Sequence, residues 1–221
     1  MAEGPVLPQQ SVATGLVPAA PGAARPGGRT ARTVTAVLAA ALAELATGGY
    51  GGLSLDSVAV RAGVHKTTVY RRWGTKERLV AAALQAVATT RVEVPDSGDV
   101  DEDLRLLARS VVATLTTAEG AGTVRAMVTG AASSAVVRSI VTTFWAERTT
   151  QAGVLVSRAV DRRQLPAGTC ATRVIRHLGA PLYHQLLVTL QPLGPDDADL
   201  AAAATASAAH AGVFTTKPDV S

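Results

Sequence analysis

The chain of 221 residues is 48% hydrophobic and only 3% aromatic, with a formal net charge of +4, so we expect a buried core of Ala, Val and Leu in closely packed helices. Its single cysteine, Cys170, excludes an internal disulfide and a thiolate zinc cage, and fits a reducing cytosol. No stretch reaches the roughly 18 uncharged apolar residues of a membrane span, and the first residues do not resemble a signal peptide.

Residues 1–28 are rich in Pro, Gly and Ala and have no apolar period, so we expect a disordered leader. Two interpretations of Arg25 and Arg29 near its end stay open. They belong either to a passive tail, which the composition favours, or to a flexible arm that follows DNA.

Four helices are predicted between residues 29 and 92. In the first, apolar side chains recur at helical spacing from Val34 to Leu45, and Gly48-Gly49 ends the helix because glycine tolerates a left-handed cap. The second is short and begins after Ser54, whose hydroxyl is a typical N-cap. Gly63 then breaks the chain, and two more helices follow over about 66–72 and, after Thr75, 75–90.

An acidic, turn-rich link from Pro95 to Asp101 marks the expected boundary between a domain over 29–92 and a second domain over 93–221. Beyond it the apolar spacing predicts five helices, over about 104–115, 123–131, 135–160, 171–190 and 197–213. Pro181 should kink the fourth of these, because proline removes a backbone donor. The predicted class is all-α, with about nine helices.

The positive charge is concentrated in the first of these domains. Between Arg25 and Arg91 there are ten basic and three acidic residues, whereas from Glu93 onward there are 11 basic and 13 acidic residues. A basic head on a near-neutral body favours a polyanionic partner, although a merely solvated basic surface would give the same counts.

The segment "LSLDSVAVRAGVHKTTVYRRWGTKERL", Leu53 to Leu79, carries the functional signal. Two short helices flank a turn at Gly63, and the second helix is apolar only at Val64, Val69 and Trp73. Its other face offers cations, hydroxyls and one aromatic, without an acid, from His65, Lys66, Thr67, Thr68, Tyr70, Arg71 and Arg72. That is the chemistry a helix in the major groove of DNA requires.

This segment resembles the signature of the TetR family of regulators, in the order of turn glycine, polar helix start, tyrosine, basic pair, aromatic residue and "TKE" helix entry. A later segment, "GAPLYHQLLVTLQPL" (Gly179 to Leu193), resembles the penultimate helix of one branch of that family. The resemblance implies a dimeric, ligand-responsive repressor, with a three-helix DNA-binding head containing a helix-turn-helix and a C-terminal helical bundle for ligand binding and dimerisation.

The resemblance also implies roles for single residues. Phosphate contacts fall to Ser54, Lys66, Tyr70 and Lys76, base-edge and phosphate contacts to Thr67 and Thr68, and buried positions to Val69 and Trp73. His65 departs from the family's usual serine, and Thr67 from its usual glycine or alanine. The operator sequence therefore does not follow from the family.

In the second domain, the candidates for an apolar effector pocket are Met127, Phe144, Trp145, His177, Tyr183 and His184. For Phe144 and Trp145 a role in the core is the favoured alternative. His177 and His184 are seven residues apart and suggest a metal pair, but no acid or cysteine completes it, so we expect neither metal nor cofactor.

The last helix is rich in alanine between Ala201 and Ala211. We expect this helix and the one that precedes it to form the interface between the two copies of a homodimer. The alternative is that it only closes its own domain. The expected partners are a palindromic double-stranded operator and an unidentified small molecule, with no membrane, in the cytoplasm.

The sequence also bears on two other classes of protein. An enzyme is not expected, because the sequence contains no Gly-rich loop after a strand, no HExxH and no GxSxG motif. A helical protein-interaction scaffold without sequence-specific DNA binding is the alternative. Such a scaffold would not need the acid-free face between Lys66 and Arg72.

Overall fold

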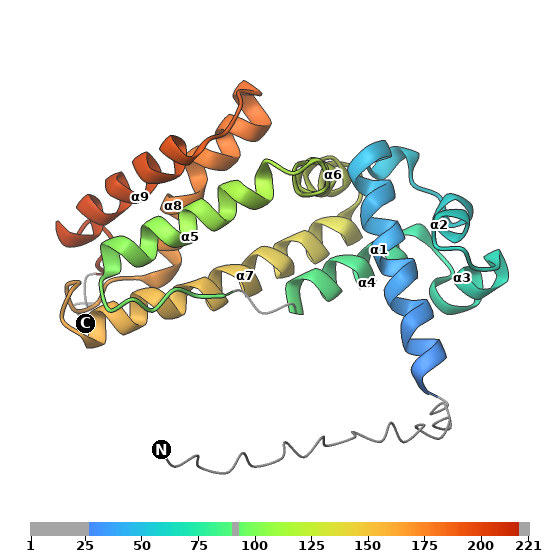
Figure 1. Ribbon diagram of the computed structural model, residues 1–221, viewed down its shortest axis with the longest axis horizontal. Helices are drawn as coiled ribbons and strands as arrows, with labels where there is room; N and C mark the ends of the chain where they lie inside the picture. Colours follow the sequence, from blue (N-terminus) through green and yellow to red (C-terminus); the bar gives the residue numbers. More distant parts are fainter. Residues whose placement is uncertain (1–26, 90–92, 217–221) are drawn as a thin grey trace, which may run out of the picture.

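The computed structural model describes residues 27–89 and 93–216, and within these ranges the regular structure is helical (Figure 1). An isolated β-bridge joins Thr169 to Thr215. The predicted all-α class is confirmed. The expected leader and Arg25 lie outside the described residues, except that the first helix already begins at Gly27.

Between residues 27 and 89, four helices form the N-terminal head. They are α1 (Gly27–Gly52), α2 (Leu55–Arg61), α3 (Lys66–Trp73) and α4 (Lys76–Thr89). In Figure 1, α2 and α3 lie at one end of the molecule, outside α1 and α4. The predicted glycine break is present at Gly49, where φ is 64°, but the chain adds a short helical stretch before α1 ends.

Local capping fixes the helix-turn-helix as the sequence predicted. The backbone N–H of Ser57 donates to Ser54 Oγ over 3.0 Å, and Ser57 Oγ accepts from the Ser54 N–H in return. Gly63 makes the turn to α3 with a φ of 65°. Thr75 Oγ1 accepts from the N–H of Arg78 at the start of α4.

Within residues 93–216, the body contains five α-helices and one π-helical turn. They are α5 (Val100–Leu115), α6 (Ala118–Ser133), α7 (Ala135–Asp161), α8 (Ala171–His184), η1 (Gln185–Thr189) and α9 (Pro195–His210). The α-helix continues through Pro181 for three residues and then widens into η1. Leu190 follows in the left-handed region, with a φ of 55°.

Helix α6 begins five residues earlier than the apolar spacing predicts. Thr117 caps it, and Gly120 and Gly122, which have poor helix propensity, lie in its first turns. A Cβ at Gly122 would lie 2.3 Å from the carbonyl oxygen of Ala46, so the glycine allows α1 to approach α6 closely. The sequence did not predict this earlier start, because Gly120 and Gly122 have poor helix propensity and close packing against α1 is what requires glycine at position 122.

The apolar side chains form two clusters, one in the body and one centred on the head. The body cluster joins α5, α7, α8 and α9. The head cluster includes Val37, Val69 and Trp73, and extends into the body helices through Met127 and Phe144. Helices α6 and α7 therefore carry part of the apolar support of the head.

The acidic link before α5 is fastened to the far end of α7. Asp96 pairs with Arg162 over 2.6 Å and with Arg158 over 3.5 Å, and the Gln164 side-chain amide donates to the carbonyl of Gly98. The side chain of Arg162 lowers the pKa of Asp96 by hydrogen bonding. These contacts fix the link where it enters α5.

By length and mean hydropathy, the stretch Thr30–Gly52 of α1 would suffice to cross a membrane, although Arg32 and Glu44 keep its uncharged runs below the roughly 18 residues of a span, as the sequence predicts. Core helices reach the same length and hydropathy. Here α1 contributes Val37, Ala41 and Leu45 to the head cluster.

Candidate nucleic-acid interface

Helix α3 divides sharply into a buried and an exposed side. Val69 is 0% exposed and Trp73 is 7% exposed, and both hold the helix against the head cluster. The exposed residues Lys66, Thr67, Tyr70 and Arg71 follow at i, i+1, i+4 and i+5, which places them on one helical face. Thr68 is half-buried at its border, and Arg72 is exposed beside it.

The three basic residues of α3, Lys66, Arg71 and Arg72, have no ion pair with an acid among the residues described. Arg72 lies with its guanidinium 5.6 Å from the ring of Trp73, a cation–π contact. Arg61 on α2 is different, because it pairs with Glu44 of α1, and this hydrogen bond lowers the pKa of Glu44. The three cations of α3 are therefore not neutralised by ion pairs with the described residues.

The N-cap of α3 is His65, the residue that replaces the family's serine. Its Nδ1 accepts from the backbone N–H of Thr67 over 3.4 Å and lies 2.9 Å from Thr67 Oγ1. The imidazole therefore performs the capping role of a serine hydroxyl, and its ring remains exposed.

One acid borders this face although α3 itself contains none. The hydroxyl of Tyr70 donates to Asp56 Oδ2 over 3.4 Å, from the first turn of α2. Asp56 lies in the first turn of α2, where a carboxylate also interacts favourably with the helix dipole, and its contact with Tyr70 spans the turn between the two helices.

Lys76 is half-buried and anchors α4 to the end of α1. Its ammonium donates to the carbonyl of Tyr50 over 2.9 Å and lies 4.3 Å from the centre of the Tyr50 ring. The Tyr50 hydroxyl donates to Glu77 Oε1 over 2.8 Å. Burial, and next the hydrogen bond to Glu77, raise the pKa of Tyr50. Sequence reasoning missed Tyr50, which lies 26 residues before its lysine partner.

The candidate effector residues do not form one site. Met127 and Phe144 are buried in the head cluster, whereas Tyr183 packs against the body cluster. Trp145 lies between them, with its ring centre 5.1 Å from that of Phe144 and 5.0 Å from that of Tyr183, both edge to face. We call Phe144, Trp145 and Tyr183 the aromatic chain, because it joins the two clusters.

Arg148 accompanies the aromatic chain and was missed from the sequence. Its guanidinium donates to the carbonyl of Val87, near the end of α4, and lies 5.5 Å from the ring of Phe144. Desolvation lowers the pKa of Arg148, and burial raises the pKa of Tyr183 to about 12. The signal available in the sequence was only that Arg148 follows Phe144 by one helical turn.

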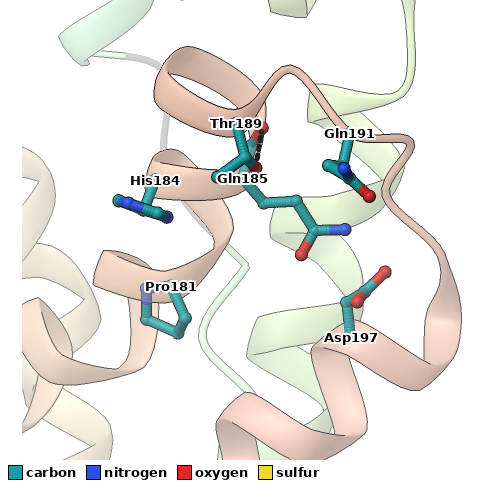
Figure 2. A pocket seen from close by; sticks show the side chains of 6 residues that line it. All are labelled: Pro181, His184, Gln185, Thr189, Gln191 and Asp197. Carbon is teal, nitrogen blue, oxygen red and sulfur yellow. Dashed lines mark hydrogen bonds between the residues drawn. The ribbon is translucent and has the colours of Figure 1, made fainter.

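The two histidines of α8 have separate surroundings. His177 Nδ1 lies 3.0 Å from Thr205 Oγ1 of α9. His184 lines a surface groove of about 500 Å³, together with Pro181, Gln185, Thr189, Gln191 and Asp197 (Figure 2). Across the described ranges, no group of three His, Cys, Asp or Glu residues could hold a metal ion.

The fold and this face define a helix-turn-helix DNA-binding regulator with a helical C-terminal domain. The family model described as "Bacterial regulatory proteins, tetR family" matches residues 37–83, and a "Tetracyclin repressor-like, C-terminal domain" matches residues 94–205. The chain belongs to the TetR family of transcriptional regulators.

Individual relatives agree with this assignment. The HTH-type transcriptional regulator AqdR of Rhodococcus erythropolis is 32% identical over 155 residues, which cover 70% of this chain and 74% of AqdR. The DNA-binding transcriptional repressor TetR of Mycobacteroides abscessus is 49% identical over 70 residues, 31% of this chain and 37% of that protein.

Solved structures share the fold. The TetR family regulator SCO0332 is 25% identical, with a TM-score of 0.64 over 80% of this chain and 97% of that one. A putative TetR-family regulator from Mesorhizobium loti MAFF303099 is 20% identical, with a TM-score of 0.66 over 85% of this chain and 99% of that one. Regulators of this family bind DNA operators and small-molecule effectors and act as dimers.

Proposed function

We propose that this chain is a cytoplasmic repressor that binds a near-palindromic operator as a homodimer and is released by a small-molecule effector. The observation that carries the proposal is the face of α3, where Lys66, Thr67, Tyr70 and Arg71 stand together, exposed and basic, over the buried anchors Val69 and Trp73.

On DNA, the proposed contacts divide into two kinds. The cations Lys66, Arg71, Arg72 and Lys76, with the hydroxyls of Ser54 and Tyr70, serve phosphates, whereas His65, Thr67 and Thr68 serve base edges. When Lys76 binds a phosphate, its ammonium either keeps its hydrogen bond to the Tyr50 carbonyl or replaces that bond by one to the phosphate. Tyr70 likewise exchanges Asp56 for a phosphate oxygen.

For dimerisation we propose the exposed sides of α8 and α9, with η1. Val188 is 66% exposed and Leu200 is 71% exposed, and Ala203, Ala204 and Ser207 lie exposed along α9. Small side chains allow helices of a second copy to approach closely, and two-fold symmetry matches two half-sites about 34–36 Å apart on DNA.

The dimer surface is tested by sedimentation of the Leu200→Glu variant. A charge placed in the interface should shift the protein toward monomer at micromolar concentration. Val60→Glu is the matched control, because Val60 is 83% exposed on α2 in the head. Dimers that persist in Leu200→Glu would contradict the proposed surface.

For the effector we propose a site at the aromatic chain, beside Arg148. The aromatic chain joins the head and body clusters. A ligand that separates Trp145 from Tyr183 therefore alters the packing that supports the head. The ligand shifts the DNA-binding equilibrium only by its differential affinity for the two arrangements.

Selection of bound fragments from random double-stranded DNA, at moderate salt, tests the function. A regulator enriches a near-palindrome, and Arg71→Ala should weaken binding to the enriched and to scrambled DNA alike. Arg163→Ala removes the same charge from the α7–α8 turn, at the far end of α7, and should change neither. If wild-type protein enriches no sequence, the scaffold alternative holds.

A further inference from the structure

The imidazole at the N-cap of α3 has one nitrogen engaged by the helix. The backbone N–H of Thr67 donates to His65 Nδ1 over 3.4 Å, and Thr67 Oγ1 lies 2.9 Å from the same nitrogen. The ring is exposed, and in the described part of the chain no hydrogen bond or ion pair involves Nε2. The second nitrogen is therefore available to a ligand.

The cap also decides where the ring carries its proton. A backbone N–H always donates, so the Nδ1 that receives it is unprotonated, and the neutral imidazole then has its proton on Nε2. The Thr67 hydroxyl can rotate its own proton toward Nδ1, which supports the same tautomer. His65 consequently offers one outward donor, Nε2–H, and no acceptor.

His65 lies at the N-terminal border of the proposed DNA-binding face. Its ring contacts Thr67, which shares that face with Lys66, Tyr70 and Arg71. In a helix-turn-helix, the N-terminal residues of the second helix contact base edges in the major groove. The donor on His65 is therefore positioned to meet bases as α3 enters the groove.

We propose that His65 is a specificity-determining residue that reads an acceptor-bearing base through Nε2–H. In the major groove guanine presents two acceptors, N7 and O6, thymine presents O4, and adenine presents N7, whereas cytosine presents only an amino donor. One position in each half-site therefore favours guanine and excludes cytosine on the contacted strand. This inference rests on the proposed function, because it requires an operator.

The test replaces the ring by side chains that keep the cap and remove the reach. His65→Asn and His65→Ser both keep an oxygen that can accept from the Thr67 N–H, and neither reaches the position of Nε2. Wild-type and variant proteins are put through the same selection from random duplexes. Affinities for the four bases at each position are then measured by competition, with unrelated DNA as the reference.

Wild-type protein should discriminate about tenfold against cytosine at one position of each half-site, as one hydrogen bond allows. Both variants should accept all four bases there within about twofold, keep the preferences at other positions, and bind unrelated DNA as before. Thermal unfolding followed by circular dichroism checks that both variants are folded.

The possible failures are distinguishable. Wild-type protein that enriches no sequence overturns the proposed function itself. An operator whose base preferences are unchanged in both variants overturns the role of His65 alone. A uniform loss of affinity in the variants, with the preference against cytosine intact, assigns Nε2–H to a phosphate and also overturns the inference.

Discussion

Helix α3 and the aromatic chain are two functional regions built on opposite principles. Helix α3 buries two anchors, Val69 and Trp73, and exposes its polar chemistry. The aromatic chain packs its rings edge to face between two apolar clusters, with Phe144 buried and Trp145 and Tyr183 half-buried. In α3 the buried anchors and the exposed polar residues are different side chains, whereas in the aromatic chain the rings proposed to meet an effector also pack against the two clusters.

The function of α3 can be predicted from the sequence, whereas that of the aromatic chain cannot. An exposed basic face on a helix that contains no acid of its own has no structural reason to exist, so its residue types point to a partner. A ring inside the body stabilises the core whether or not a ligand binds near it. In the head, mutations should therefore distinguish residues that stabilise the fold from residues that contact DNA. In the body, mutations should not distinguish residues that stabilise the fold from residues that contact an effector.

The largest effect is expected from Trp73→Ala. Trp73 is 7% exposed and belongs to the head cluster, so its loss should lower the free energy of unfolding by about 3–5 kcal/mol and abolish DNA binding, although it lies on the buried side of α3. Denaturant unfolding and gel shifts measure both.

The chain's other tryptophan is the matched control. Trp145 is half-buried, so Trp145→Ala should be less destabilising and should leave DNA binding measurable. Equal losses of stability and DNA binding in both variants would show that the head depends on the aromatic chain as much as on its own anchor. The proposed difference between the two regions would then be wrong.

Tyr183 should make the body sensitive to alkali. Its pKa is raised from 10.0 to about 12, mainly by burial, so the unfolded chain loses the phenol proton first as the pH rises. Stability is unaffected below pH 10 and falls by up to about 3 kcal/mol between pH 10 and 12. Tyr183→Phe should flatten this part of the profile in urea unfolding series.

Some alkaline loss should remain in that variant, because burial also raises the pKa of Tyr50 in the head. Tyr50→Phe is therefore the companion measurement. If Tyr183→Phe leaves the profile between pH 10 and 12 unchanged, the phenol is solvated and the aromatic chain is open to water.

A third contrast concerns the contact of the head with α6. Gly122→Ala places a Cβ 2.3 Å from the carbonyl oxygen of Ala46 and 2.5 Å from its Cα, so α1 and α6 have to separate. We expect a loss of about 1–3 kcal/mol, as in other overpacked cores, and weaker operator binding because α1 supports the head.

Gly48→Ala on α1 is the control, because a Cβ there meets nothing within 4 Å. That variant should be neutral or more stable by up to about 1 kcal/mol. A Gly122→Ala protein as stable as wild type would mean that α1 and α6 adjust freely, and that this contact does not fix the head.

The sequence predicted what local rules determine and missed what distant contacts determine. Ser54, Gly63 and Thr75 act within a few residues of themselves, and each performs its predicted capping or turn role. The contact of Lys76 with Tyr50 and that of Arg148 with Val87 join residues 26 and 61 positions apart, which no periodicity encodes. The predicted effector residues lie in different parts of the body for the same reason, because their positions depend on contacts between distant segments.

The smallest effect is expected from removing one helix cap in each region. Ser54→Ala removes the oxygen that accepts from the Ser57 N–H, and Thr117→Ala removes the one that accepts from the Gly120 N–H at the start of α6. Each should lower the free energy of unfolding by about 1 kcal/mol, because both lose one N-cap hydrogen bond. Only Ser54 is also proposed to meet a phosphate, so only Ser54→Ala should weaken operator binding beyond the loss of stability, by a factor that falls as salt rises. Equal operator affinities in the two variants, measured at 50 and 200 mM salt, would leave Ser54 a cap alone, and the separation of support from contact would then fail at the first residue of the motif.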